Sequence, residues 1–278
     1  MDTYNIKDGP KDGKKVFRKL GTCSRTFFHI LNREFGHPKA LEERAADALA
    51  GGIMQKGHQC GMLWGASMAA GAEAYRKCKN QNEAIAVAVN ATRKLMVSFS
   101  NRELTINCRA ITHCDFSSKL SMAKYVFSGR FLHCFNLAEQ WAPEAVQSAI
   151  EVLTKKEIKS SIEYMSCATE VVKRMGASDE EMIIVAGFAG GLGLSGAACG
   201  GLAAAVWMKS LKWCREVEKK SSLTNSYAKE TLDMFYEKMD SKILCSDITG
   251  VRFKNMDNHT KHIKYGGCKH LIETLAYS

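Results

Sequence analysis

The sequence predicts an all-α fold made of two tandem, homologous helical-bundle units that are related by an internal pseudo-two-fold axis. Apolar residues recur at helical spacing, and no strict alternation of apolar and polar residues is long enough to indicate a sheet. One pattern of cysteines occurs twice, which indicates a duplication. The 278 residues are 46% hydrophobic and 24% charged with only three prolines, a composition that excludes collagen-like, disordered and low-complexity classes.

Each predicted helix has one apolar face. Residues three, four and seven positions apart lie on the same side of a helix, and both halves of the chain show this spacing. The faces, in chain order, are formed by Cys23, Phe27, Ile30 and Leu31; by Cys134, Leu137 and Trp141; by Val146, Ile150, Leu153, Ile158, Ile162 and Met165; and by Cys167, Val171 and Met175. Proline is favoured in the first turn of a helix, so a new helix is expected to begin at Pro143.

Eight of the eleven cysteines mark the duplication. The matching segments are Gly57-x-x-Cys60-Gly61-x-Leu63 with Gly196-x-x-Cys199-Gly200-x-Leu202, Cys108-Arg-Ala-Ile-Thr with Cys245-Ser-Asp-Ile-Thr, and Cys134-x-x-Leu with Cys268-x-x-Leu, while Cys23 and Cys167 each begin an amphipathic stretch. The offset between partners falls in small steps from 144 to 134 residues, as differences in loop length would produce. We therefore divide the chain into a first four-cysteine helical unit, residues 1–142, and a second, residues 143–278.

Four dispersed cysteines in each unit predict a metal centre. Thiolates ligate zinc and iron–sulfur clusters, and the wide spacing predicts one cysteine from each of four helices, pointing into the bundle interior. Structural zinc sites usually draw on closely spaced pairs, so zinc is less favoured. The candidate ligands are Cys23, Cys60, Cys108 and Cys134 in the first unit and Cys167, Cys199, Cys245 and Cys268 in the second. The unmatched Cys78, Cys114 and Cys214 are expected to be packing residues or surface thiols.

Glycines flank the second cysteine of each unit. The run from Gly191 to Gly196 matches the dinucleotide-binding fingerprint, but the βαβ unit that this fingerprint requires is not predicted around it. We expect the glycines instead to allow close backbone approach, so that N–H groups can reach an anionic cluster beside the cysteines. The candidate cofactor-binding glycines are Gly57, Gly61, Gly190, Gly191, Gly196 and Gly200.

Charge and hydropathy indicate where the protein is expected to be located and which partners it is expected to lack. The N-terminal segment has no apolar stretch typical of a secretory signal, so a cytoplasmic protein with reduced thiols is expected. The uncharged stretch from Met182 to Met208 contains seven glycines and predicts a buried, tightly packed helix pair and no membrane span. The formal net charge is +10, but no nucleic-acid-binding motif accompanies it, so no nucleic-acid partner is expected. The positive charge could instead offset a bound anionic group.

The segment from Gly187 to Leu202, with Cys167 before it and Cys245 and Cys268 after it, resembles the C-GCAxxG-C-C family of redox-active proteins. The resemblance implies four functional cysteines per unit and a redox centre that serves oxidoreductase or transport systems. The second unit is the more typical one. The first is divergent because part of its glycine run is replaced by Gln55-Lys56, so its site is expected to be altered or empty.

These observations favour an electron-transfer protein with an iron–sulfur cluster in one or both halves over a self-contained enzyme. The sequence does not distinguish a [2Fe–2S] from a [4Fe–4S] cluster, and it predicts no catalytic residue. The expected partners are redox proteins, and the chain is expected to be a monomeric pseudo-dimer or a homodimer. Two alternatives stay open: a metal-free thiol–disulfide oxidoreductase, and a non-redox helical interaction protein whose cysteines only pack.

Overall fold

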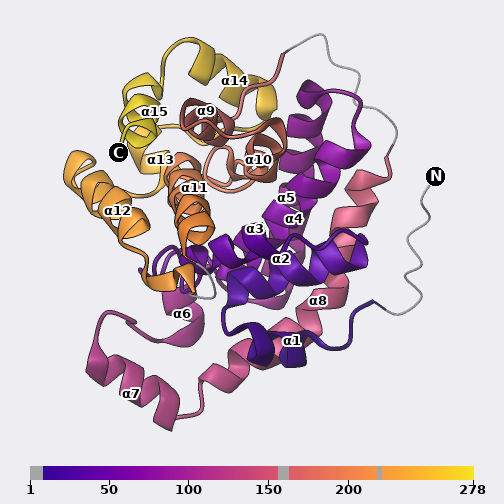
Figure 1. Cartoon of the computed structure of the whole chain (residues 1–278), viewed down its shortest axis with the longest axis vertical. Coiled ribbons are helices and arrows are strands. Elements are labelled where there is room, and N and C mark those ends of the chain that lie inside the picture. Colours follow the sequence, from indigo (N-terminus) through magenta and orange to yellow (C-terminus); the bar gives the residue numbers. More distant parts are fainter. Residues whose placement is uncertain (1–8, 156–162, 218–220) are drawn as a thin grey trace.

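The computed structural model describes residues 9–155, 163–217 and 221–278, which form helices joined by loops (Figure 1). In this part of the chain there is no strand, and the β-type pairings are two isolated bridges. The predicted all-α class is confirmed. Two positions of one predicted apolar face, Ile158 and Ile162, lie outside the described residues, as does the N-terminal segment 1–8.

The same order of elements occurs in both halves. The first half consists of α1 (Gly13–Leu20), α2 (Cys23–Glu34), α3 (Ala40–Ala45), the 3₁₀ helix η1 (Ala46–Leu49), α4 (Gly61–Lys77), α5 (Gln81–Arg102), α6 (Cys108–Thr112), α7 (Lys119–Phe127) and α8 (Phe131–Leu153). The second half consists of α9 (Cys167–Arg174), α10 (Asp179–Ile184), η2 (Ala186–Phe188), α11 (Gly200–Glu216), η3 (Ser222–Thr224), α12 (Ser226–Lys238), α13 (Cys245–Thr249), α14 (Met256–Lys264) and α15 (Lys269–Ala276). Apart from α1 and η3, each element of one half has a counterpart in the other, α2 with α9 through α8 with α15.

Local sequence explains where equivalent helices begin. Asn80 and Asn225 cap α5 and α12, and their side-chain oxygens accept hydrogen bonds from the backbone N–H groups of Glu83 and Ala228. An asparagine cap of this kind stabilises a helix by about 1 kcal/mol. Ser178 and Glu181 form a reciprocal capping box at the start of α10. The asparagine caps of α5 and α12 are therefore common to both halves, whereas the capping box of α10 is not repeated at α3, whose N-cap Lys39 forms no side-chain cap bond.

The centre of the molecule is formed by α4 and α11, which are almost wholly buried. Helix α4 packs against α10 and η2 of the second half, and α11 packs against α3 and η1 of the first half. Because α3 and η1 are the counterparts of α10 and η2, each half contributes the same surface to the contact, as in a two-fold dimer interface. The predicted internal pseudo-two-fold is confirmed.

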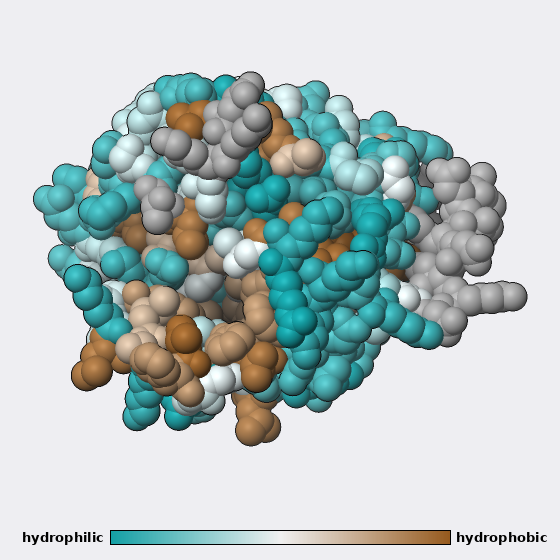
Figure 2. Space-filling model, turned by 60° about the horizontal axis from the view of Figure 1, so that its bottom comes forward, coloured by the Kyte–Doolittle hydropathy of each residue, from teal (hydrophilic) through white to brown (hydrophobic). Residues whose placement is uncertain are grey.

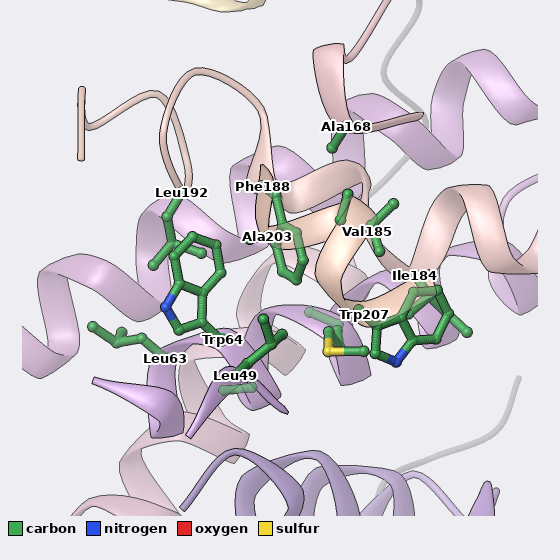
Figure 3. Close-up of a cluster of buried hydrophobic side chains, with 14 of the residues drawn as sticks. Leu49, Leu63, Trp64, Ala168, Ile184, Val185, Phe188, Leu192, Ala203 and Trp207 are labelled. Carbon is green, nitrogen blue, oxygen red and sulfur yellow. The ribbon is translucent and has the colours of Figure 1, made fainter. Parts of the chain in front are cut away.

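Both halves share one hydrophobic core (Figure 3). The ring of Trp64 meets the ring of Phe188 edge-on, with centroids 4.8 Å apart. The indole N–H of Trp207 donates to the carbonyl of Glu42 at 3.3 Å. A Cβ atom at Gly71 would lie 2.3 Å from the carbonyl oxygen of Ile183, so glycine is required for this close helix contact. Because of this close packing, the folded structure of each half depends on the other half.

The helix start expected at Pro143 is wrong. Helix α8 runs without interruption from Phe131 to Leu153, with Pro143 inside it, so no new helix begins at that residue. An internal proline costs a helix about 3 kcal/mol. Burial offsets this cost, because the apolar face continues past the proline through Val146, Ile150 and Leu153 and packs along α5. Residues 143–153 therefore extend the last helix of the first half.

The long uncharged segment lies in the core. Residues 182–208 contain the end of α10, η2, an irregular loop and the first half of α11, and nearly all of them are buried. The predicted burial is present, but the two helices on either side of the glycine-rich loop do not pack tightly on each other: α10 packs mainly against α4, and α11 packs against α9 and α12. Among the described residues, no helix has both the length and the apolar character needed to cross a bilayer.

Candidate functional site

The glycine-rich loop of each half forms a left-handed turn. Five consecutive residues have positive φ in residues 51–55 and again in residues 190–194. The non-glycine members are Ile53, Met54, Gln55, Leu192 and Leu194. Left-handed backbone costs such residues about 1–2 kcal/mol each, and strain of this kind concentrates at functional sites. The divergent first half thus keeps the backbone shape of the second, although it has fewer glycines.

The loops hold the second and third cysteines of each half side by side. The backbone N–H of Cys60 donates to Ile106 at 2.7 Å, and that of Cys108 donates to His58 at 2.6 Å. The second half repeats this arrangement, with N–H donation from Cys199 to Ile243 at 2.8 Å and from Cys245 to Ala197 at 2.7 Å. Two segments distant in sequence are therefore paired by backbone bonds directly at the thiols.

Each of the eight matched cysteines lies at the N-terminal end of a helix. Four are the first residue of a helix, three are N-cap residues, and Cys134 lies in the first turn of α8. The prediction of four helices per unit agrees with this placement, but the predicted location inside a bundle needs correction. Helix N-termini converge on the thiols, and their free N–H groups and dipoles favour negative charge there.

In the first half the four thiols line one cavity of about 250 Å³. Cys60 and Cys108 are buried, whereas Cys23 and Cys134 are half-buried. The other lining residues are mostly apolar, and five are aromatic: Phe17, Phe116, Tyr125, Phe131 and Phe135. Leu223 of the second half also lines the cavity. The structure thus brings together all four cysteines predicted for this half.

The thiols of the first cavity differ in acidity. The thiol of Cys60 donates a hydrogen bond to Cys23, and with the backbone N–H of Gly51 this lowers the pKa of Cys23 to about 7. The same hydrogen bond, together with burial, raises the pKa of Cys60 well above its usual value. Burial also raises the pKa of Cys108, and it raises that of Cys134 to about 11. One thiolate next to a protonated thiol is the charge state that this geometry stabilises.

In the second half the four thiols surround a cavity of only about 20 Å³. Cys167, Cys199 and Cys245 are buried, and Cys268 is half-buried. Burial raises the pKa of all four thiols, to about 12 for Cys199 and Cys268. Backbone N–H groups of Gly190 and Gly201 donate toward Cys167 and oppose this effect. All four predicted cysteines of the second half therefore also meet, in a closed site.

The fourth cysteine of each half has a polar partner that the cysteine pattern does not reveal. The hydroxyl of Tyr125 on α7 donates to Sγ of Cys134 at 3.6 Å. Nε2 of His262 on α14 lies 3.7 Å from Sγ of Cys268. The offset of 137 residues that relates Cys108 to Cys245 also relates Tyr125 to His262, so aligning α7 with α14 would have found the pair.

The predicted glycines fall into two groups. Four lie close to the thiols or to the cavity: Gly61, Gly190, Gly191 and Gly200. A Cβ atom at Gly61 would lie 2.5 Å from Sγ of Cys23. Gly57 and Gly196 lie instead against Arg109 and Ser246 and shape the loop. The prediction omitted Gly51 and Gly201, which donate backbone N–H groups to thiols.

The unmatched cysteines line neither cavity. Cys78 follows the last residue of α4, and Cys214 lies near the end of α11. Cys114 is buried beside Ser121, whose hydroxyl donates to its sulfur at 3.6 Å. Considering also histidine, aspartate and glutamate, no three side chains in the described ranges are placed so as to hold a single metal ion.

Comparison with known families gives two matches. Residues 22–147 and residues 165–277 each match the model described as "Putative redox-active protein (C_GCAxxG_C_C)". The matches together cover most of the chain, and each contains one set of four cysteines. Neither a curated protein nor a solved structure matches the chain.

Proposed function

Because the chain belongs to the C_GCAxxG_C_C family of redox-active proteins, with one family unit in each half, we propose that it is an electron-transfer protein with an iron–sulfur cluster in one or both halves. One observation carries the proposal: in each half, four thiols from the N-termini of four helices line a single cavity. Two divergent halves keep this arrangement, which packing alone does not require.

The chemistry of the donor set fits such a cluster. Four cysteine thiolates are the usual ligands, and a bound cluster would accept and release single electrons. The ligands would be Cys23, Cys60, Cys108 and Cys134 in the first half and Cys167, Cys199, Cys245 and Cys268 in the second. Glycine at position 61 leaves space beside the Cys23 sulfur that any side chain would fill.

Cavity size favours a group larger than one ion in the first half. Its volume of about 250 Å³ exceeds that of an engineered apolar cavity of about 150 Å³ that accommodates benzene. The second cavity, about 20 Å³, has room for roughly one water molecule. A single zinc ion, bound tetrahedrally by four ligands, would need the thiols of the first cavity to draw together.

Charge also supports the proposal. A cluster with four thiolate ligands is negatively charged, and the formal charge of the protein is +10. Backbone N–H groups at Cys23, Cys167 and Cys199 supply the hydrogen bonds to sulfur that raise the reduction potential of a cluster. These backbone groups would stabilise negative charge on the thiolates.

Anaerobic purification tests this function. The protein should be brown and should contain iron and acid-labile sulfide in similar amounts. Cys108→Ala should lose the iron of the first half and Cys245→Ala any iron that the second half binds, whereas Cys78→Ala, the matched control outside both cavities, should keep the iron content of the wild type. A colourless, iron-free protein whose eight matched thiols all react with a thiol reagent would contradict the proposal.

The hydrogen-bonded pair of Cys23 and Cys60 favours a second candidate, metal-free thiol–disulfide exchange. The Cys23 thiolate would attack a substrate disulfide and release one substrate thiol. Cys60 would then lose its proton and attack the Cys23 sulfur, releasing the second thiol. The substrate gains two electrons, one proton from Cys60 and one from water, and the protein gains one disulfide. A mass loss of two hydrogens that is absent in Cys60→Ala would support this candidate over the cluster.

A further inference from the structure

Helix α7 projects from the body of the molecule beside the first cavity (Figure 1). None of its nine residues is buried, whereas its counterpart α14 buries Met256, His259, Thr260 and Ile263. Leu120 and Phe127 of α7 are 81% and 90% exposed. Figure 2 brings this end of the molecule forward and shows hydrophobic side chains gathered beside a hollow.

The helix register shows that closure onto the cavity would not bury this surface. At the offset of 137 residues, the buried positions of α14 correspond to Lys119, Met122, Ala123 and Val126 of α7. Leu120 and Phe127 correspond instead to Asp257 and Lys264, which are on the solvent side of α14. An inward movement of α7 to the position of α14 would therefore leave Leu120 and Phe127 in water. Two large apolar side chains on an outer face indicate a contact with another molecule.

The charge around this surface indicates the nature of that molecule. Residues 116–138 contain no aspartate or glutamate. Three cations lie in this segment, and the structure shows no ion pair for any of them within the described chain: Lys119, Lys124 and Arg130. An acidic surface would neutralise these cations, and complementary charge steers and orients association.

The pattern of side chains favours a protein over a membrane or a second copy. A helix that lies on a membrane separates its apolar face from its charged face. In α7 the charged Lys124 lies on the same face as Leu120 and Phe127, because it is four residues after one and three before the other. A second copy would bring the same three cations against these three. An acidic protein satisfies both the apolar and the charged groups.

We propose that the outer face of α7, formed by Leu120, Lys124 and Phe127, docks a small acidic electron-carrier protein at the first cavity. This inference rests on the proposed electron-transfer function. The inner side of the same helix carries Tyr125, whose hydroxyl contacts Sγ of Cys134 at 3.6 Å. A carrier on the outer face would therefore lie about one helix diameter, roughly 10 Å, from the thiols.

Binding measurements with two acidic carriers, a flavodoxin and a ferredoxin, test the proposal. We expect at least one to bind, and the Leu120→Ser/Phe127→Ser double variant to weaken binding about tenfold or more. Lys124→Glu should weaken it in the same direction, and added salt should weaken the wild-type complex. Tyr265→Ser/Tyr277→Ser removes two exposed aromatic residues from the second half and is the matched control, which should bind like the wild type.

Three results would overturn the docking proposal. Neither carrier binds, the α7 double variant binds a carrier as tightly as the wild type does, or the same residues of α7 instead mediate self-association or membrane binding. Sedimentation would show self-association that the double variant loses, and vesicles with anionic phospholipids would reveal membrane binding. Circular dichroism checks that each variant is folded. Carrier binding can be measured whether or not iron is present. If an iron-free protein still binds a carrier through α7, the cluster proposal is contradicted and the docking proposal stands.

Discussion

The two four-cysteine sites have equivalent ligands and equivalent loops, yet one is open and the other is closed. The first cavity has a volume of about 250 Å³ and the second about 20 Å³. Both sets of thiols begin equivalent helices, so the cysteines do not cause the difference. Phe253, just before α14, and His259 within it line the second cavity and are buried, whereas α7 contributes the half-buried Tyr125 to the first cavity and has no buried residue. The covering helix, and not the ligand set, sets the accessibility of each site.

One difference between the equivalent helices disfavours packing of α7 in the manner of α14. Met256 begins α14 and is buried, whereas Lys119 stands at the equivalent position of α7 and is exposed. A lysine ammonium is almost never fully buried without a partner. Four substitutions can break or sharpen this comparison, and we give them in order of decreasing expected effect.

The largest effect is expected at Gly200, where α11 meets η2. A Cβ atom there would lie 1.9 Å from the carbonyl oxygen of Phe188, a backbone atom that cannot move alone. Gly200→Ala should lower the free energy of unfolding by about 3 kcal/mol or more, measured by urea denaturation. The neighbouring Gly201→Ala is the control, since its nearest contact would be 3.3 Å. Equal losses in the two variants would show that this contact does not limit packing.

The second effect concerns pH. Burial lowers the pKa of His259 from 6.5 to about 4, so this residue is neutral in the folded protein, while the unfolded chain takes up a proton as pH falls below 6.5. Stability should therefore decline between pH 6.5 and pH 4, with a contribution of about 2 kcal/mol from His259 at pH 4.5.

The first half has Met122 at the position of His259, so His259→Met copies one site into the other. This variant should have a smaller difference in unfolding free energy between pH 7 and pH 4.5 than the wild type. His270→Asn alters an exposed histidine and should keep the wild-type dependence. An unchanged pH dependence in His259→Met would argue against a neutral His259 in the fold.

The third effect is on thiol reactivity in metal-free protein. Cys23 has a pKa of about 7, whereas burial raises the pKa of its counterpart Cys167 above 9.0. At pH 7, Cys23 should react with iodoacetamide about tenfold faster than Cys167. Mass spectrometry of the labelled peptides measures both rates. In Cys60→Ala the midpoint of the Cys23 rate profile should move to higher pH, because the hydrogen-bond donor is lost. If the pH profile of the Cys23 labelling rate does not move in Cys60→Ala, the reactivity of Cys23 does not depend on its hydrogen bond with Cys60.

The smallest effect is expected from Lys119→Met, which places the α14 residue on α7. In the wild type, amide hydrogens of α7 should exchange at least about tenfold faster than those of α14. The variant should slow exchange in α7 and raise the unfolding free energy by less than about 1 kcal/mol. Lys124→Met, on the outer face, is the matched control and should leave exchange unchanged. Equal exchange in α7 and α14 of the wild type would contradict the open arrangement.

The candidate cysteines and the duplication could be predicted from the sequence, because the same residue types recur at similar offsets in the two halves. Cys108 and Cys245 can be paired by the motif that follows them, and helical spacing predicts α2 and α9. The backbone path between such markers depends on tertiary contacts. The left-handed turn at Ile53 opposes local preference, and α8 continues through Pro143 because α5 packs against it on both sides of the proline. Both depend on residues far away in the chain.

Other features were missed because equivalent positions carry different residues. Tyr125 and His262 contact the fourth cysteine of their halves with different chemistry, so a search for identical residues passes over them. At the first position of the two helices, the exposed Lys119 of α7 stands where α14 has the buried Met256, and we expect this difference to favour the projection of α7. Neither Lys119 nor Met256 belongs to a recognisable motif. The role of each residue can be inferred only from the residues that pack around it.

Covalent fusion of the two halves has a consequence for how this protein can change. In a dimer of identical subunits, any substitution at one site is copied to the other, so an open site and a closed site could not be encoded separately. Here Tyr125 and His262, or Lys119 and Met256, are independent codons in one gene. The shared core fixes the pairing of the halves, and symmetry can be broken at one site while the other keeps its form. One chain can therefore keep one four-cysteine site open to its surroundings and the other closed, although both are built from the same unit.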